Sequence, residues 1–257
     1  MFSQFQGILG NGKICSQYSN ICTILMANHL YLLPTVLSDG TTAKVLPTQV
    51  VELISQIPIF FVENVRTARR FLSSLKVGIV ISEVQFIELT KDTPEIDTKN
   101  QLAKLAGNVG VLSEAGCPGI ADPGSVVVKW AHILGWKVVP TVGPSSILLG
   151  LMGSGFNGQS FTFHGYLPID SNALVKKMRS MISDVQSKNE TQIWIETPYR
   201  NHAMLETICR VVPPTMRLCI GYDLTGEDEF IWTGTIAQWK KKQINFHKIP
   251  AIFLLGQ

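Results

Sequence analysis

The sequence predicts an α/β protein built from two α/β domains. From His29 onward, short apolar segments typical of strands alternate with amphipathic segments typical of helices. This alternation needs crossover connections, so the first half is expected to form a mostly parallel sheet. Beyond the glycines and prolines of residues 142–158 the order changes, which indicates a mixed sheet. We therefore expect an N-terminal domain over residues 26–141 and a C-terminal domain over residues 142–257.

The first 25 residues carry Ser, Gln, Asn and Gly without helical or strand periodicity. We expect an extension there that is poorly ordered, with Met26 opening the folded part. The apolar run of this extension is too short for a signal peptide.

The composition is that of a globular chain with a sizeable core. Of its 257 residues, 46% are hydrophobic and 16% charged, which excludes global disorder. The richest apolar runs, residues 57–62 and 147–152, are far shorter than the roughly 20 residues of a membrane span, so no membrane partner is expected. A net charge of +3 is too small for general attraction to nucleic acid but permits a local RNA-binding patch.

Cysteine and histidine usage predicts a cytoplasmic protein without a bound metal. The five cysteines are odd in number and widely spaced, and they form no C-x-x-C pair, which is typical of reduced thiols. His164 and His202 have no partners at metal-binding spacing.

Capping and turn residues delimit the expected elements of the first domain. Pro47 opens one helix and Asn64 caps the next. Strands are expected at residues 29–34, 58–62, 109–112 and 137–140, and helices at residues 47–56, 64–75, 99–106 and 125–134.

The second domain is expected to be richer in strands. Phe230 and Trp232 alternate with polar neighbours, as in an antiparallel strand with one solvated face. Strands are expected at residues 160–164, 191–196, 217–222, 229–234 and 251–255, and helices at residues 173–187 and 200–211.

A glycine-rich segment directly after an expected strand carries the most concentrated functional signal. Residues 112–124 read L-S-E-A-G-C-P-G-I-A-D-P-G. Glycine lets the backbone approach a ligand closely, and Asp122 is expected to cap the following helix. Small ligands in α/β sheets lie outside the carboxyl ends of strands, where this segment falls. We favour ligand binding over a merely long strand-to-helix connection.

A second turn, V-G-P-S-S-I at residues 142–147, repeats this design after the next strand. Exposed backbone N–H groups and the hydroxyls of Ser145 and Ser146 begin an apolar helix there. Alone it is a good helix start. Two such turns on adjacent strand ends are more informative than either one.

Together these segments resemble the tetrapyrrole methylase superfamily of S-adenosylmethionine (SAM)-dependent methyltransferases, and within it the ribosomal small subunit methyltransferase I branch. That branch methylates a ribose 2′-hydroxyl of a cytidine in small-subunit ribosomal RNA. The segments that carry the resemblance are S-E-A-G-C-P-G-I-A-D-P-G at 113–124, V-P-T-V-G-P-S-S at 139–146, F-T-F-H-G-Y-L-P at 161–168, V-E-N-V-R at 62–66, E-T-P-Y-R at 196–200, and Y-D-L-T at 222–225 leading to Gly234-Thr235.

The resemblance implies a homodimer of two-domain subunits, with SAM in the cleft between the domains. Its implied cofactor contacts, many of them through backbone atoms, are Pro34, Cys117, Ile120, Ser145, Ser146, Glu196, Thr197, Tyr222 and Ala251.

Four charged residues are candidates for work at the methyl acceptor. Glu63 or Glu114 would take a proton from a hydroxyl. Arg66 and Arg200 would hold an RNA phosphate in bidentate fashion. For each of the four the alternative is a structural ion pair or a solvated surface charge.

Two departures from the ribosomal branch keep other functions open. The first loop, residues 34–39, lacks the branch's glycine-asparagine element, and V-E-N-V-R has lost an acid and a hydroxyl from the branch's E-D-T-R. The alternatives are SAM-dependent methylation of a tetrapyrrole or other small molecule, and a catalytically silent SAM-binding module. A dinucleotide-dependent oxidoreductase is disfavoured because no G-x-G-x-x-G follows the first strand.

Overall fold

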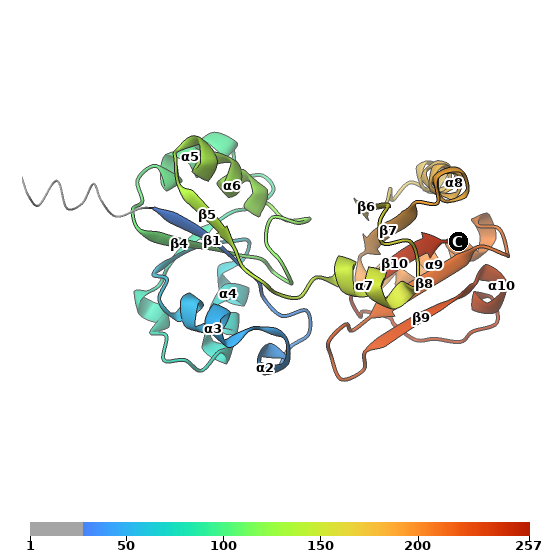
Figure 1. Cartoon of the computed structure of the whole chain (residues 1–257), viewed down its shortest axis with the longest axis horizontal. Coiled ribbons are helices and arrows are strands. Elements are labelled where there is room, and N and C mark those ends of the chain that lie inside the picture. Colours follow the sequence, from blue (N-terminus) through green and yellow to red (C-terminus); the bar gives the residue numbers. More distant parts are fainter. Residues whose placement is uncertain (1–27) are drawn as a thin grey trace, which may run out of the picture.

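The structure, a computed structural model, describes residues 28–257. The extension expected over residues 1–25 lies outside the described residues. Two five-stranded sheets follow each other along the chain, joined by a segment that leads into helix α7 (Figure 1).

The first sheet is parallel throughout, as predicted. Its strand order is β3-β2-β4-β1-β5. The bounds are His29–Leu33 for β1, Ile59–Val62 for β2, Gln85–Glu88 for β3, Asn108–Leu112 for β4 and Lys137–Pro140 for β5. Because the strands are parallel, the loops after β1, β2, β4 and β5 all leave the sheet at one edge.

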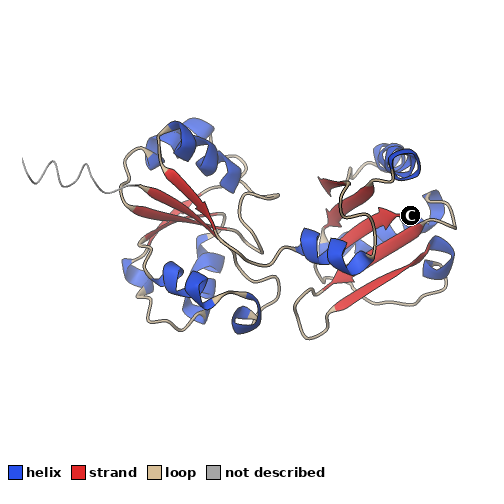
Figure 2. Cartoon of the chain, in the orientation of Figure 1, coloured by secondary structure: helices blue, strands red, loops and turns tan. Residues whose placement is uncertain are grey.

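Helices cover both faces of this sheet (Figure 2). Neighbouring residues of β2 point to opposite faces: Phe61 packs in a cluster with Val127 of α6, and Phe60 in a cluster with Leu72 of α4. The helices run over Thr42–Val45 (α2), Thr48–Ser55 (α3), Val65–Ser74 (α4), Glu95–Leu102 (α5) and Gly124–Ile133 (α6), with a 3-10 turn at Ile81–Glu83.

Asn64 caps α4 as the sequence predicts. Its side-chain oxygen accepts hydrogen bonds from the backbone N–H groups of Arg66 at 2.9 Å and Thr67 at 3.3 Å. These bonds satisfy two of the donors that a helix start leaves free.

The helix expected at residues 99–106 is displaced toward the N-terminus. It runs over Glu95–Leu102, with Pro94 as its N-cap residue and Glu95 and Asp97 in its first turn. Proline and acidic residues favour a helix start, and here they place it at Glu95, four residues before the expected start at Lys99. The helix ends before Gly107, whose φ of 84° turns the chain into β4.

The second sheet is mixed, also as predicted. Its order is β6-β7-β10-β8-β9, with β6 parallel to β7 and the other pairs antiparallel. The bounds are Phe161–Tyr166 for β6, Thr191–Glu196 for β7, Arg217–Tyr222 for β8, Phe230–Thr235 for β9 and Ala251–Gly256 for β10. All six residues of β10, the central strand, are buried.

Helices sandwich this sheet as well. On one face, Phe253 packs with side chains of α8 (Ser171–Lys188) and α9 (Asn201–Val211). On the other, Ile252 packs with Leu151 of α7 (Ser146–Ser154). A Cβ at Gly150 would lie 3.0 Å from Ile252, so glycine permits this close approach of α7 to β10.

Three short elements were not predicted: α2, β3 and α10 (Ile236–Trp239). Each has four residues, too few for a periodic apolar pattern. The domain boundary expected near Val142 lies between β5 and α7 and stays a prediction. None of the helices in the described part is both long and apolar enough to cross a membrane.

Candidate active site

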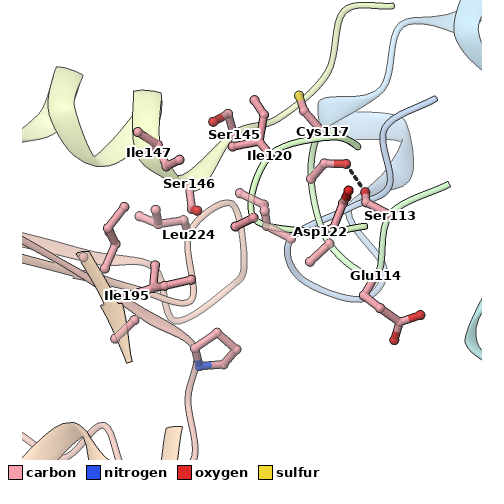
Figure 3. A pocket seen from close by; sticks show the side chains of 18 of the residues that line it. Ser113, Glu114, Cys117, Ile120, Asp122, Ser145, Ser146, Ile147, Ile195 and Leu224 are labelled. Carbon is pink, nitrogen blue, oxygen red and sulfur yellow. Dashed lines mark hydrogen bonds between the residues drawn. The ribbon is translucent and has the colours of Figure 1, made fainter. Parts of the chain in front are cut away.

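A cavity of about 390 Å³ lies where the carboxyl edge of the first sheet meets the second sheet (Figure 3). One wall is the glycine-rich loop after β4, which presents Ser113, Cys117 and Ile120. The opposite wall presents Ile195 of β7 and Leu224 of the loop after β8. Ser145, Ser146 and Ile147 at the start of α7 line the side between them.

The glycine-rich loop is held in shape by its own polar groups. Asp122 Oδ1 accepts hydrogen bonds from the backbone N–H groups of Gly119 at 2.7 Å and Gly124 at 2.8 Å. Asp122 thus serves the first helical N–H of α6, as expected of a cap, although Pro123 is the N-cap residue. Its second oxygen, Oδ2, is buried and has no hydrogen-bond partner.

The loops after β1, β4 and β5 are bonded to one another. The Thr35 N–H donates to the Gly116 carbonyl at 3.0 Å, and the Cys117 thiol donates to the Pro144 carbonyl at 3.4 Å. Gly116 has a φ of 75°, in the left-handed region, and a Cβ there would lie 3.0 Å from the same Pro144 carbonyl. Glycine at this position therefore allows the two turns found in the sequence to form one cavity wall.

Three carboxylates lie close together at this edge. Burial raises the pKa of Glu63, at the end of β2, to about 6, and the charges of Asp122 and Glu114 add to the rise. Burial also raises the pKa of Asp122, against the lowering effect of its bonds from Gly124 and Gly119. Glu114 is exposed and accepts a hydrogen bond from the Thr67 hydroxyl at 3.1 Å. In Figure 3 its carboxylate points away from Asp122.

A buried ion pair closes the cavity on the side of the second sheet. The side chain of Glu196, at the end of β7, is fully buried and lines the cavity. Its Oε1 accepts a hydrogen bond from the Thr197 N–H at 2.7 Å. Its Oε2 lies 3.3 Å from a guanidinium nitrogen of Arg200, whose side chain is 31% exposed. Arg200 thus has a structural partner.

Eight of the residues proposed from the sequence line the cavity: Glu63, Glu114, Cys117, Ile120, Ser145, Ser146, Glu196 and Ala251. Five others do not: Pro34, Arg66, Thr197, Arg200 and Tyr222. The roles assigned to all of them stay predictions.

The five residues outside the cavity have other surroundings. Arg66 is exposed on α4, and Thr197 is exposed beside Glu196. Pro34 is buried against Gly143, and a Cβ added to Gly143 would clash with the proline ring. Tyr222 stacks on Phe230 and Phe246 with ring centroids 4.7 Å and 5.7 Å away.

Sequence reasoning missed several apolar lining residues of the second sheet, including Phe163, Ile195, Leu224 and Ile252. Phe163 and Leu224 lie inside segments already singled out, but nothing in their local pattern distinguishes a cavity wall from a core. Among residues 28–257 there is no group of three or more His, Cys, Asp or Glu side chains arranged to hold a metal ion.

Lys242 lies over two aromatic rings of β9. Lys242 Nζ lies 4.4 Å from the ring centroid of Trp232 and 5.7 Å from that of Phe230. This lysine therefore covers an aromatic surface of β9.

Several curated relatives of the chain carry the same name. Ribosomal RNA small subunit methyltransferase I from Leptospira borgpetersenii is 30% identical over 212 residues, an alignment that covers 80% of this chain and 79% of the relative. The protein of that name from Escherichia coli O157:H7 is 25% identical over 231 residues and covers 88% and 77%. None of the protein-family models matches the chain.

Solved structures share the fold. Uroporphyrin-III C-methyltransferase from Thermus thermophilus, solved with S-adenosylhomocysteine, superposes with a TM-score of 0.54 at 16% identity, covering 90% of this chain and 98% of that one. A conserved hypothetical protein from Aeropyrum pernix K1 reaches a TM-score of 0.62 at 12% identity, covering 90% and 85%. At these identities the likeness concerns the architecture of two α/β units.

Proposed function

Because this chain belongs to the ribosomal RNA small subunit methyltransferase I family, we propose that it transfers a methyl group from SAM to a ribose 2′-hydroxyl of small-subunit ribosomal RNA. The observation that carries this proposal is the cavity between the two sheets, walled by the glycine-rich loop after β4 and the start of α7. Ligand pockets of this kind lie outside the carboxyl ends of parallel strands.

The cavity suits SAM in size and in the chemistry of its lining. Its volume of about 390 Å³ lies in the usual range for small-molecule sites. Ile120, Ile147 and Leu224 offer apolar surface to an adenine ring. The Asp122 carboxylate offers an acceptor to a ribose hydroxyl or an ammonium group, because its buried Oδ2 has no hydrogen-bond partner in the protein.

When bound, SAM supplies an electrophilic methyl group on a sulfonium. The protein's main contribution is to hold donor and acceptor in line, which is worth about 7 to 11 kcal/mol in well-oriented reactions. A ribose hydroxyl is a weak nucleophile, so its proton needs an acceptor as the new oxygen–carbon bond forms. Glu63 is our candidate for this base, since a pKa of about 6 leaves it ionised yet more basic than an exposed carboxylate at neutral pH.

Glu114 and Arg66 lie on the side of the cavity where α4 begins. Glu114 lines both the cavity and a second pocket of about 210 Å³ that Thr67 and Arg70 also line. We keep Glu114 as the alternative base and Arg66 as an RNA phosphate contact. Arg200 is better explained by its pairing with Glu196.

The wall formed by Gly116 can be tested directly. We expect Gly116→Ala to weaken SAM binding by about tenfold, since a Cβ would both strain a left-handed residue and press on the Pro144 carbonyl. Gly135→Ala is the matched control, because Gly135 has the same φ of 75° but nothing within 4 Å of the added Cβ. Isothermal titration with SAM should separate the two variants, and equal affinities would contradict the placement of SAM here.

The acceptor is tested by incubating the protein with labelled SAM and undermethylated small ribosomal subunits. We expect label in ribosomal RNA, at a single ribose whose 3′ linkage becomes resistant to alkaline hydrolysis. Transfer to a tetrapyrrole instead of RNA would support the small-molecule alternative. Tight SAM binding without transfer to either acceptor would indicate a silent binding module.

We also propose that the protein works in the cytoplasm, as its cysteine usage indicates, and that it forms a homodimer, as the family resemblance implies. Three apolar side chains leading into and along α7 support a self-association surface: Val142, Leu148 and Met152 are 75%, 53% and 79% exposed. Clustered exposed apolar residues commonly mark protein interfaces.

A further inference from the structure

Two segments distant in sequence are fastened together beside the cavity. The Asn201 side chain, fully buried at the start of α9, donates hydrogen bonds to the carbonyls of Phe246 at 3.0 Å and Ile249 at 2.8 Å. The Lys248 N–H donates to the Pro198 carbonyl at 3.1 Å. The loop before β10 is therefore fixed against the turn after β7.

This junction presents an aromatic and cationic surface, which we call the Tyr199 platform and define as Tyr199, His247 and Lys248. All three residues are exposed, and Tyr199 is 71% exposed. The His247 ring meets Tyr199 edge to face, with centroids 6.2 Å apart, and Lys248 Nζ lies 5.6 Å from the centre of the Tyr199 ring. The tyrosine is thus restrained while most of its surface stays available.

The platform lies at the rim of the cavity. Pro198, next to Tyr199, and Pro250, two residues after Lys248, both line the cavity. The Glu196 carboxylate, three residues before Tyr199, is fully buried and paired with Arg200, so the guanidinium offsets its negative charge beside the platform. The ammonium group of Lys248 therefore gives the platform a cationic character that complements phosphate.

We propose that the Tyr199 platform binds an unpaired nucleotide of single-stranded RNA, with its base stacked on Tyr199 and a phosphate beside Lys248. The inference rests on the proposed function, because it states how the RNA substrate is held. A ribose buried in a regular helix cannot enter a cavity between two sheets, so the target segment has to be splayed out. Proteins hold splayed bases on aromatic side chains and their phosphates on cations.

Direct binding to RNA tests the platform without any methyl transfer. The probe is a short fluorescein-labelled oligocytidylate, followed by fluorescence anisotropy. We expect Tyr199→Ala to weaken binding by about tenfold and Tyr199→Phe to retain it, because stacking needs the ring and not the hydroxyl. Lys248→Gln should weaken binding and reduce the slope of log affinity against log salt by about one.

Matched controls come from surfaces away from the cavity. Phe161, 40% exposed, is the first residue of β6, whereas the last residue, Tyr166, lines the cavity. Phe161→Ala should therefore leave RNA affinity unchanged. Lys137, exposed at the start of β5, provides the charge control as Lys137→Gln. SAM affinity, measured by titration, should be the same in every variant.

The outcomes separate this inference from the proposed function. If the wild-type protein binds oligocytidylate through Tyr199 but methylates no ribosomal RNA, the proposed function fails and the nucleotide site stands. If Tyr199→Ala and Lys248→Gln both keep wild-type RNA affinity, the inference is overturned, even where methyl transfer occurs. If the two variants lose binding to whole ribosomal subunits but keep wild-type affinity for oligocytidylate, the platform contacts a ribosomal protein. That outcome would also overturn the inference.

Discussion

Replacing Glu63 with glutamine is expected to lower methyl transfer by about 10²- to 10⁴-fold, the range usually supplied by one general base. Glutamine keeps the size of the side chain but cannot take the hydroxyl proton. Glu63 lines the cavity, and burial with the charges of Asp122 and Glu114 raises its pKa to about 6. SAM affinity should change little in this variant, so the loss should appear in kcat.

The pH dependence gives the second signature of the same prediction. For a base with a pKa of about 6, kcat/KM of the wild-type protein should rise with pH through about 6 and level off above 7. The Glu63→Gln protein should lack this rising limb. Glu52→Gln, on the exposed side of α3, is the matched control and should follow the wild-type profile. An unchanged limb in the Glu63→Gln protein would assign the base elsewhere, with Glu114 the next candidate.

Thermal stability of the wild-type protein should fall with rising pH, whereas its kcat/KM should rise. Because the fold raises the pKa of Glu63 above its ordinary value of 4.5, the folded state disfavours the ionised carboxylate. Below pH 4.5 the group is protonated in both states and has no effect. As the pH rises through about 6, wild-type stability falls, so Glu63→Gln should have the higher Tm at pH 8 and an equal Tm at pH 4. Equal Tm values at both pH values would contradict the raised pKa.

The wall of the site nearest the first sheet was predictable because its signals are local. Glycines followed by a helix cap at Asp122, and the turn before Ser145, each lie directly after a recognisable strand. Parallel strands bring such loops to one edge without any knowledge of tertiary contacts. The largest displacement among the expected helices is that of α5, which was expected to begin at Lys99, whereas its start signal lies at Pro94 and Glu95.

The other wall depends on pairing between distant segments, which local patterns do not encode. Leu224 lines the cavity because β8 pairs with β10, and the Tyr199 platform exists because Asn201 holds the loop before β10. A contact between the two halves, from Lys44 Nζ to the Thr225 carbonyl at 3.0 Å, spans 181 residues. No periodicity within either segment predicts it.

The Glu196–Arg200 pair shows the same limit, since its four-residue spacing is visible but its burial is not. The spacing alone fits a surface helix pair, an RNA contact or a buried pair. In the structure the Glu196 side chain is fully buried at the end of β7, an interior strand of the sheet, and Arg200 covers it from the solvent side. Removing Arg200 should therefore lower the stability of the fold, because it leaves a buried carboxylate without a counter-charge.

We expect Arg200→Ala to destabilise the fold by about 3 kcal/mol, because removing one partner leaves an uncompensated carboxylate in the interior. The double variant Glu196→Gln/Arg200→Ala should recover much of this loss, since the Gln carbonyl oxygen can still accept from the Thr197 N–H without carrying charge. Lys188→Ala is the control, because Lys188 and Asp184 have the same spacing but an exposed lysine, and it should change stability little. Urea denaturation measures all three. If Arg200→Ala proves as mild as Lys188→Ala but abolishes RNA methylation, Arg200 contacts the substrate as the sequence first suggested.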